Sequence, residues 1–116
     1  MKKYFGFVIL VLFANILLFS NSFAKNKNEV TEKITTSAVC TMCKDRIESN
    51  LKKIDGILES SLDVNSKVLT VKFDKTKLTL DDIRKKLSDI GYDADNVKRD
   101  VRAYKKLPPC CKDGKY

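Results

Sequence analysis

The sequence predicts an α+β sandwich in which one four-stranded antiparallel sheet carries two helices on one face, with the elements in the order βαββαβ. Two observations lead to this fold class. Runs rich in β-branched or alternating apolar residues precede, separate and follow two segments whose apolar residues recur at helical spacing. Glycine follows each helical segment, where helices commonly end. The chain is long enough for one small domain with a single core.

The first strand and the first helix are predicted over residues 30–36 and 44–54. Residues 30–36 are rich in β-branched side chains, which favour strands. Gly56 is placed to end the helix. Within residues 44–54 the apolar side chains share one helix face: Ile47, Leu51 and Ile54.

A hairpin is predicted next, from residues 57–64 and 67–73. The two runs flank Asn65-Ser66, a pair of residues that is typical of turns. The second run alternates apolar and polar residues, as expected for a strand with one buried face. Its apolar positions are Leu69, Val71 and Phe73.

The second helix is predicted to begin after Thr79. Asp82, three positions later, makes this start a relative of the capping box, in which two side chains satisfy free backbone N–H groups. Gly91 is predicted to end the helix, and residues 92–101 to form the fourth strand. The apolar stripe of the helix comprises Leu80, Ile83, Leu87 and Ile90.

Residues 1–24 are predicted to be a secretory signal peptide. Lys2 and Lys3 give a basic start, residues 4–19 are mostly apolar, and small residues precede a cleavage site after Ala24. The alternative is an uncleaved membrane anchor, which usually needs about 20 apolar residues. The polar run that follows favours cleavage. We therefore expect a periplasmic or otherwise exported protein with no stable membrane insertion after cleavage.

The rest of the chain is predicted to divide into one domain over residues 25–101 and a basic tail over residues 102–116. The whole chain carries a net charge of +8. Nucleic acid is not an expected partner, because export separates the protein from it and because the lysines are dispersed without interleaved aromatic residues. The charge is interpreted as the solvated surface of a monomer.

Cys40 and Cys43 are the candidate metal ligands. They form a Cys-x-x-Cys pair between the first strand and the first helix, which predicts Cys40 in a loop and Cys43 in the first helical turn. Free backbone N–H groups and the helix dipole favour the thiolate there. Two soft thiolates select a d¹⁰ ion such as Cu(I) or Hg(II), and Zn(II) ranks behind these two.

The element order, the Cys-x-x-Cys pair at the first loop-to-helix junction and Gly91-Tyr92 after the second helix resemble the heavy-metal-associated domain family. This family includes copper chaperones, metal-transporting ATPases and periplasmic mercury-binding proteins. The resemblance spans residues 29–101 and implies a ferredoxin-like fold. It also implies that Cys40 and Cys43 are the metal ligands. By the same resemblance Tyr92 lies in a loop that packs beside the site, where it either shields the ligands or simply covers the end of the core.

One departure from the family concerns methionine. The family usually places a methionine two positions before the first cysteine, where this chain has Ala38. Met42 lies between the two cysteines, and we interpret it as an apolar filler or exposed side chain in preference to a third ligand. The Gly-Tyr pair is similar to that of bacterial copper chaperones and favours Cu(I), whereas the exported layout resembles periplasmic mercury carriers.

The tail contains Pro108-Pro109-Cys110-Cys111. Two prolines stiffen the chain and remove backbone donors, so the tail is predicted to leave the sheet as an extended arm that is mobile in the reduced, metal-free protein. Cys110 and Cys111 are candidate auxiliary ligands, as is Met42. A vicinal disulfide and two free thiols are the alternatives for the cysteine pair.

Three classes of function fit these cysteines. The predicted class is a carrier, not an enzyme, that passes a soft ion by ligand exchange to a metal-transporting membrane protein or to another metal-binding domain. A thiol–disulfide oxidoreductase is disfavoured, because no proline lies between the cysteines and the chain has no tryptophan. A structural zinc module with four cysteine ligands is disfavoured, because Cys110-Cys111 is a poor second knuckle.

Overall fold

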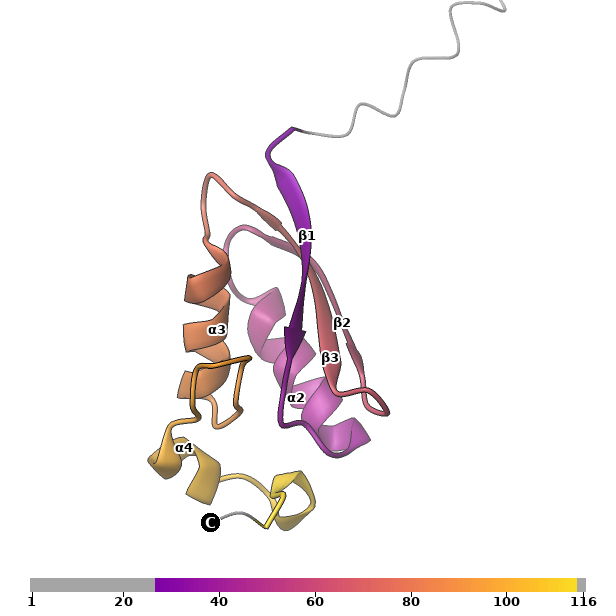
Figure 1. Ribbon diagram of the computed structural model, residues 1–116, viewed down its shortest axis with the longest axis vertical. Helices are drawn as coiled ribbons and strands as arrows, with labels where there is room; N and C mark the ends of the chain where they lie inside the picture. The colour runs from indigo at the N-terminus through magenta and orange to yellow at the C-terminus, as the bar shows by residue number, and fades with distance from the viewer. Residues whose placement is uncertain (1–26, 115–116) are drawn as a thin grey trace, which may run out of the picture.

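The computed structural model describes residues 27–114 and contains one sheet packed against helices (Figure 1). The three strands are antiparallel in the order β1-β3-β2. Their bounds are β1 (Glu29–Thr35), β2 (Ile57–Asp63) and β3 (Val68–Asp74). The helices are α2 (Thr41–Lys52), α3 (Leu80–Asp89), α4 (Val101–Lys105) and a final 3-10 turn, η1 (Pro109–Cys111).

The predicted signal peptide, residues 1–24, lies outside the described residues. Within residues 27–114, no helix has both the length and the apolar character that a membrane crossing requires.

One hydrophobic core lies between the sheet and the two long helices. Alternate residues of β3 are buried, and the residues between them stay partly exposed. The core cluster joins the buried face of β3 to both helices and includes Leu69, Val71, Phe73, Ile47, Leu51, Ile83 and Leu87. Both helices therefore cover the same face of the sheet, and the predicted arrangement of two helices on an antiparallel sheet is confirmed.

α3 begins with the capping arrangement predicted at Thr79. The N–H group of Asp82 donates to Thr79 Oγ1 at 3.1 Å, and the N–H group of Thr79 donates to Asp82 Oδ2 at 2.9 Å. Hydrogen bonds from the backbone and the side chain of Thr79 to the Asp82 carboxylate lower the pKa of Asp82, because they stabilise its charged form. The helix start is thus fixed by two local side chains.

The prediction of a fourth strand over residues 92–101 is wrong. Within residues 27–114 the sheet has three strands, and Ala94 forms one isolated antiparallel bridge with Thr36, just beyond the end of β1. The next residue, Asp95, has a φ of +51°, a left-handed conformation that no strand continues. Pairing beside β1 therefore ends after a single residue.

A tight turn takes the place of the missing strand. Ala94 bridges back to Val97, with 2.9 Å hydrogen bonds in both directions. The side chain of Asp95 accepts the N–H group of Thr35 at 2.9 Å, so a carboxylate satisfies the donor that a neighbouring strand would have used.

The tail folds back against the domain, contrary to the prediction of an extended arm. α4 begins after Asp100, whose carboxylate accepts the N–H group of Ala103 at 2.9 Å. Tyr104, Leu107 and Cys111 are buried, and they join the main core cluster. Apolar burial thus holds the tail in spite of its prolines.

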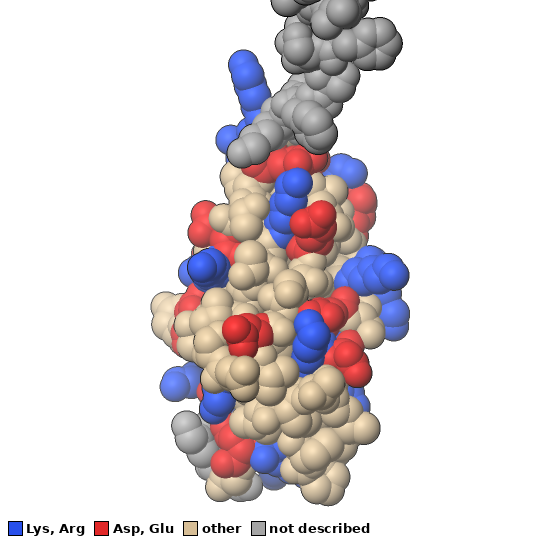
Figure 2. All heavy atoms as spheres, turned by 90° about the vertical axis from the view of Figure 1, so that its right-hand side faces the viewer, with Lys and Arg blue, Asp and Glu red and all other residues tan. Residues whose placement is uncertain are grey.

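Charges of both signs are interspersed over the face of the molecule shown in Figure 2. Surface ion pairs join Lys72 to Glu29 at 3.2 Å and Lys77 to Asp55 at 3.2 Å. The lower end of this face, where α2 begins and η1 lies, is mostly uncharged. On this face the basic residues form no continuous stripe of the kind that follows a nucleic-acid backbone.

Gly91 links the end of α3 to the position of α4. Its φ is +100°, and its N–H group donates to Ser88 O at 3.0 Å while Tyr92 N–H donates to Leu87 O at 3.0 Å. A Cβ atom at this position would lie 2.9 Å from the backbone nitrogen of Tyr104 in α4. Only glycine allows both the turn and the close approach.

We expect Gly91→Ala to lower the free energy of unfolding by about 2 kcal/mol, because it combines left-handed strain with a clash against backbone atoms. Gly114→Ala is the matched control, since Gly114 has a φ of +75° but no atom within 4 Å of the added Cβ. Urea denaturation of both variants measures the difference. Equal losses in the two variants would show that the contact with α4 contributes nothing.

Candidate metal site

The first half of the candidate site lies where the chain enters α2. Cys40 immediately precedes the helix with an extended backbone, and Cys43 lies in the first turn and is fully buried. Their Sγ atoms are 3.4 Å apart. This is the placement that the Cys-x-x-Cys spacing predicts.

The environment of Cys40 favours its thiolate. Burial raises the pKa of Cys40. Hydrogen bonds outweigh burial and bring the pKa below its ordinary value; they involve the backbone and thiol of Cys43, then the thiol of Cys111 and the backbone of Met42. Backbone N–H groups at the start of a helix lack helical partners and therefore stabilise an anion. Cys40 therefore loses its proton more readily than an ordinary cysteine thiol does.

The tail supplies the second half of the site. The Sγ atom of Cys111 lies 3.8 Å from that of Cys40, and the exposed Cys110 thiol donates to Met42 Sδ at 3.2 Å. The sulfur atoms of Cys40, Cys110 and Cys111 all lie within 4.8 Å of one another. We call these five residues, Cys40, Met42, Cys43, Cys110 and Cys111, the sulfur cluster. All four cysteines are free thiols.

Tyr92 lies beneath the sulfur cluster. It is fully buried, and its hydroxyl has no hydrogen-bond partner. Burial raises the pKa of Tyr92, and the neighbouring thiols of Cys43 and Cys111 raise it further. Burial likewise raises the pKa of Cys111, followed by the thiol of Cys43. Without an ion, Cys111 is therefore held as a neutral thiol beside a neutral phenol.

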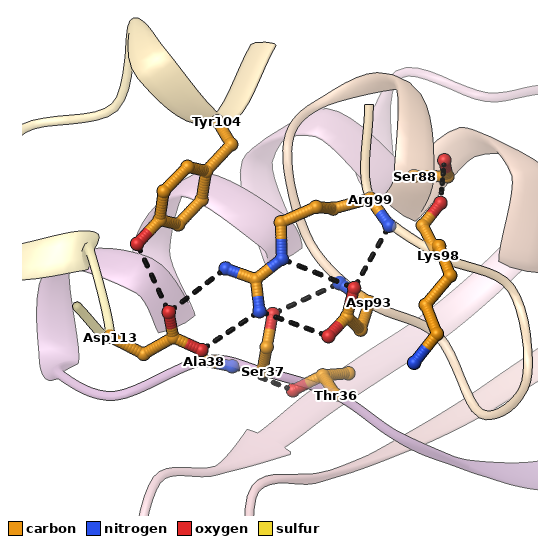
Figure 3. Close-up of polar contacts among 9 residues, drawn as sticks. All are labelled: Thr36, Ser37, Ala38, Ser88, Asp93, Lys98, Arg99, Tyr104 and Asp113. Atoms are coloured by element: carbon orange, nitrogen blue, oxygen red, sulfur yellow. Dashed lines mark hydrogen bonds and ion pairs between the residues drawn. The ribbon is translucent and has the colours of Figure 1, made fainter. Parts of the chain in front are cut away.

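A buried arginine, Arg99, joins the tail to the rest of the domain (Figure 3). Arg99 Nη2 lies 2.9 Å from Asp93 Oδ2 and 2.8 Å from Asp113 Oδ2, and the Arg99 side chain is only 2% exposed. The guanidinium carbon lies 4.4 Å from the ring centroid of Tyr104, whose hydroxyl donates to Asp113 Oδ1 at 3.0 Å. We call Asp93, Arg99, Tyr104 and Asp113 the arginine clamp.

The arginine clamp also reaches the loop that carries Cys40. The N–H group of Asp93 donates to Ser37 Oγ at 2.9 Å, and the N–H group of Arg99 donates to Asp93 Oδ1 at 2.9 Å (Figure 3). Hydrogen bonds from Arg99 lower the pKa of Asp93, because they stabilise its charged form. The two halves of the site are thus tied to one guanidinium.

The structure brings every candidate site residue named from the sequence to one end of the molecule. Sequence reasoning missed the arginine clamp, whose members are separated by many positions and match no motif. The sequence does show Arg99 between two aspartates, Asp93 and Asp113, but these residues lie in segments that were predicted to be a strand and a solvated tail. That pattern is too common on protein surfaces to indicate burial.

The fold and the site together define a small α+β domain that presents thiols at one end of its sheet. The family model of the heavy-metal-associated domain matches residues 37–93. A 54-residue segment is 30% identical to the copper chaperone CopZ of Staphylococcus aureus, covering 47% of this chain and 79% of that protein. The chain belongs to the heavy-metal-associated domain family.

Two further comparisons extend this result. A 67-residue segment is 30% identical to a copper-exporting P-type ATPase of Staphylococcus saprophyticus, covering 58% of this chain but only 8% of the ATPase. A solved CopZ metallochaperone has 26% identity and a TM-score of 0.54, over 56% of this chain and 98% of that one. The family match includes Cys40, Cys43 and Tyr92 and ends before Arg99 and the tail cysteines.

We expect Arg99→Leu to lower the free energy of unfolding by about 3 kcal/mol, because two carboxylates lose a buried partner. The same change should expose Cys111 to alkylation, since the tail loses its clamp. Urea denaturation and thiol labelling followed by mass spectrometry measure the two effects.

Arg84→Leu is the matched control. Arg84 also contacts two aspartates, Asp81 and Asp95, but its side chain is 23% exposed and the Asp81 side chain 85%. We expect a loss of about 1 kcal/mol or less and no change in Cys111 labelling. Equal effects of the two variants would contradict the role assigned to the arginine clamp.

Proposed function

We propose that this protein is a metallochaperone that carries a soft thiophilic ion, Cu(I) in preference to Hg(II), on Cys40 and Cys43. The observation that carries the proposal is the pair of Sγ atoms 3.4 Å apart at the start of α2, one of them with a lowered pKa. Thiolate ligands suit Cu(I) and other soft ions without a large ligand cage. The ion is cargo and takes part in no reaction of the protein.

The choice of Cu(I) rests on two further points. The chain has no histidine, and the candidate site offers sulfur donors, which favours a soft ion over a harder one. The relatives described above are named as a copper chaperone and a copper-exporting ATPase. Hg(II) is the second soft ion, and Zn(II) bound by four thiolates ranks third.

Delivery by ligand exchange requires a sulfur that a partner can reach. Cys40 is partly exposed and Met42 is 52% exposed, whereas Cys43 is fully buried. A thiolate of the partner joins the ion, Cys40 leaves first, and Cys43 leaves last. The partner we propose is a metal-transporting ATPase or another metal-binding domain, which approaches the site from the side where Met42 and Cys110 are exposed.

We expect Cys40→Ser and Cys43→Ser each to weaken Cu(I) binding by about a hundredfold or more, since each removes one of two primary thiolates. Cys110→Ser is the matched control and should change the affinity by less than about threefold, because Cys110 is exposed and is not one of the two proposed primary ligands. Competition of the reduced protein against a calibrated Cu(I) chelator measures the affinities, and native mass spectrometry ranks Cu(I), Hg(II) and Zn(II).

Full affinity in Cys40→Ser or Cys43→Ser would exclude these cysteines as the carrier site. Preference for Zn(II) over Cu(I) would instead support a structural zinc module. Turnover of a disulfide substrate by the metal-free protein would support a thiol–disulfide oxidoreductase.

Export is part of the proposal. The basic start, the apolar stretch and the small residues before Ala24 support cleavage of residues 1–24 and a periplasmic or other exported location. We expect the processed protein to begin at Lys25. N-terminal sequencing of protein from the extracytoplasmic fraction tests this, and an intact N-terminus in a membrane fraction would show an anchor instead.

A further inference from the structure

The tail places a buried thiol directly beside the carrier pair. We propose that Cys111 is a third thiolate ligand of the ion bound by Cys40 and Cys43, so that Cu(I) is held by three sulfurs and not by two. This inference rests on the proposed carrier function. Cys110 and Met42 lie at the exposed edge of the sulfur cluster.

The spacing of the sulfurs favours three ligands. With metal–sulfur bonds of about 2.3 Å, two sulfurs on one ion lie ~4.6 Å apart in linear, ~4.0 Å in trigonal and ~3.8 Å in tetrahedral geometry. The Sγ atoms of Cys40 and Cys111 are 3.8 Å apart, and those of Cys40 and Cys43 are 3.4 Å apart. The separation of Cys40 and Cys111 lies near those of trigonal and tetrahedral sites, and both separations are shorter than that of a linear, two-sulfur site.

The surroundings of Cys111 can accommodate a charged ligand. When thiols bind Cu(I) they release their protons to solvent, so three thiolates and one Cu(I) leave the site with negative charge. The buried hydroxyl of Tyr92 has no hydrogen-bond partner and neighbours Cys43 and Cys111. The Tyr92 hydroxyl can therefore donate a hydrogen bond to a thiolate at the site. The free N–H groups at the start of α2 are further hydrogen-bond donors there.

The arginine clamp places this third ligand before any ion binds. Asp113, two positions after Cys111, is held by Arg99 at 2.8 Å and by the hydroxyl of Tyr104 at 3.0 Å. The tail is therefore ordered by contacts that do not involve metal. A ligand that is already in place loses little conformational entropy on binding, which raises affinity.

A third ligand changes how the ion leaves. Cys111 must release the ion and take back a proton before a partner with two thiolates can hold the ion alone. The partner is therefore one that first displaces the tail. In the absence of such a partner, release to a small chelator is slow.

Two measurements on the reduced protein with one equivalent of Cu(I) test the proposal. Copper X-ray absorption spectroscopy should count three sulfur neighbours in the wild type and two in Cys111→Ser. A count of two in Cys110→Ser would show that Cys110 is a ligand of the ion and would overturn the proposal. Transfer of Cu(I) to a chelator should be about tenfold faster or more in Cys111→Ser than in the wild type.

Two sulfur neighbours in the wild type, or equal release rates from the wild type and Cys111→Ser, overturn the proposal and leave the carrier function intact. Failure of the wild type to bind Cu(I) overturns the carrier function itself. Amide NMR spectra confirm the fold of each variant. If Cys111→Ser does not fold, the sulfur counts of the wild type, Cys110→Ser and Met42→Leu decide, because a count of three in all of them leaves Cys111 as the third ligand.

Discussion

The ion pairs between Arg99 and two aspartates are the interaction on which the arrangement of the site depends. Asp93 lies next to the loop that leads to Cys40, and Asp113 lies at the end of the tail that carries Cys110 and Cys111. One guanidinium neutralises both carboxylates through a planar set of donors that a lysine lacks. The stacked ring of Tyr104 excludes water from one side of it.

Buried ion pairs contribute less to stability than their geometry suggests, because desolvation of the charges offsets most of the attraction. Their value lies in specificity, since few other arrangements satisfy the same charges. In this protein the two aspartates lie on opposite sides of the guanidinium (Figure 3), so a shift of the tail by one residue would break the ion pair of Asp113. The position of Cys111 beside Cys40 is the one that keeps both pairs.

The parts of the fold with short periodic patterns could be predicted from the sequence. The alternation of Leu69, Val71 and Phe73 and the capping residue Thr79 act locally, and the local signal is sufficient. The absence of a strand over residues 92–101 could not be predicted, because the side chain of Asp95 takes the place of a strand partner only where β1 presents the N–H group of Thr35. In the site, the spacing of Cys40 and Cys43 implied their contact, but the return of the tail depends on Arg99 and on burial of Tyr104, which only tertiary structure reveals.

The contact between Cys40 and Cys111 joins residues 71 positions apart in the chain. In the unfolded chain only Cys40 and Cys43 lie close enough to share an ion. Bringing Cys111 to Cys40 there would close a long loop, and a weak thiol contact does not offset the entropy lost in doing so. The complete sulfur cluster is therefore a property of the folded state, assembled last, after the sheet and the tail have formed. Newly made protein would acquire its full set of sulfur donors only on completing its folding.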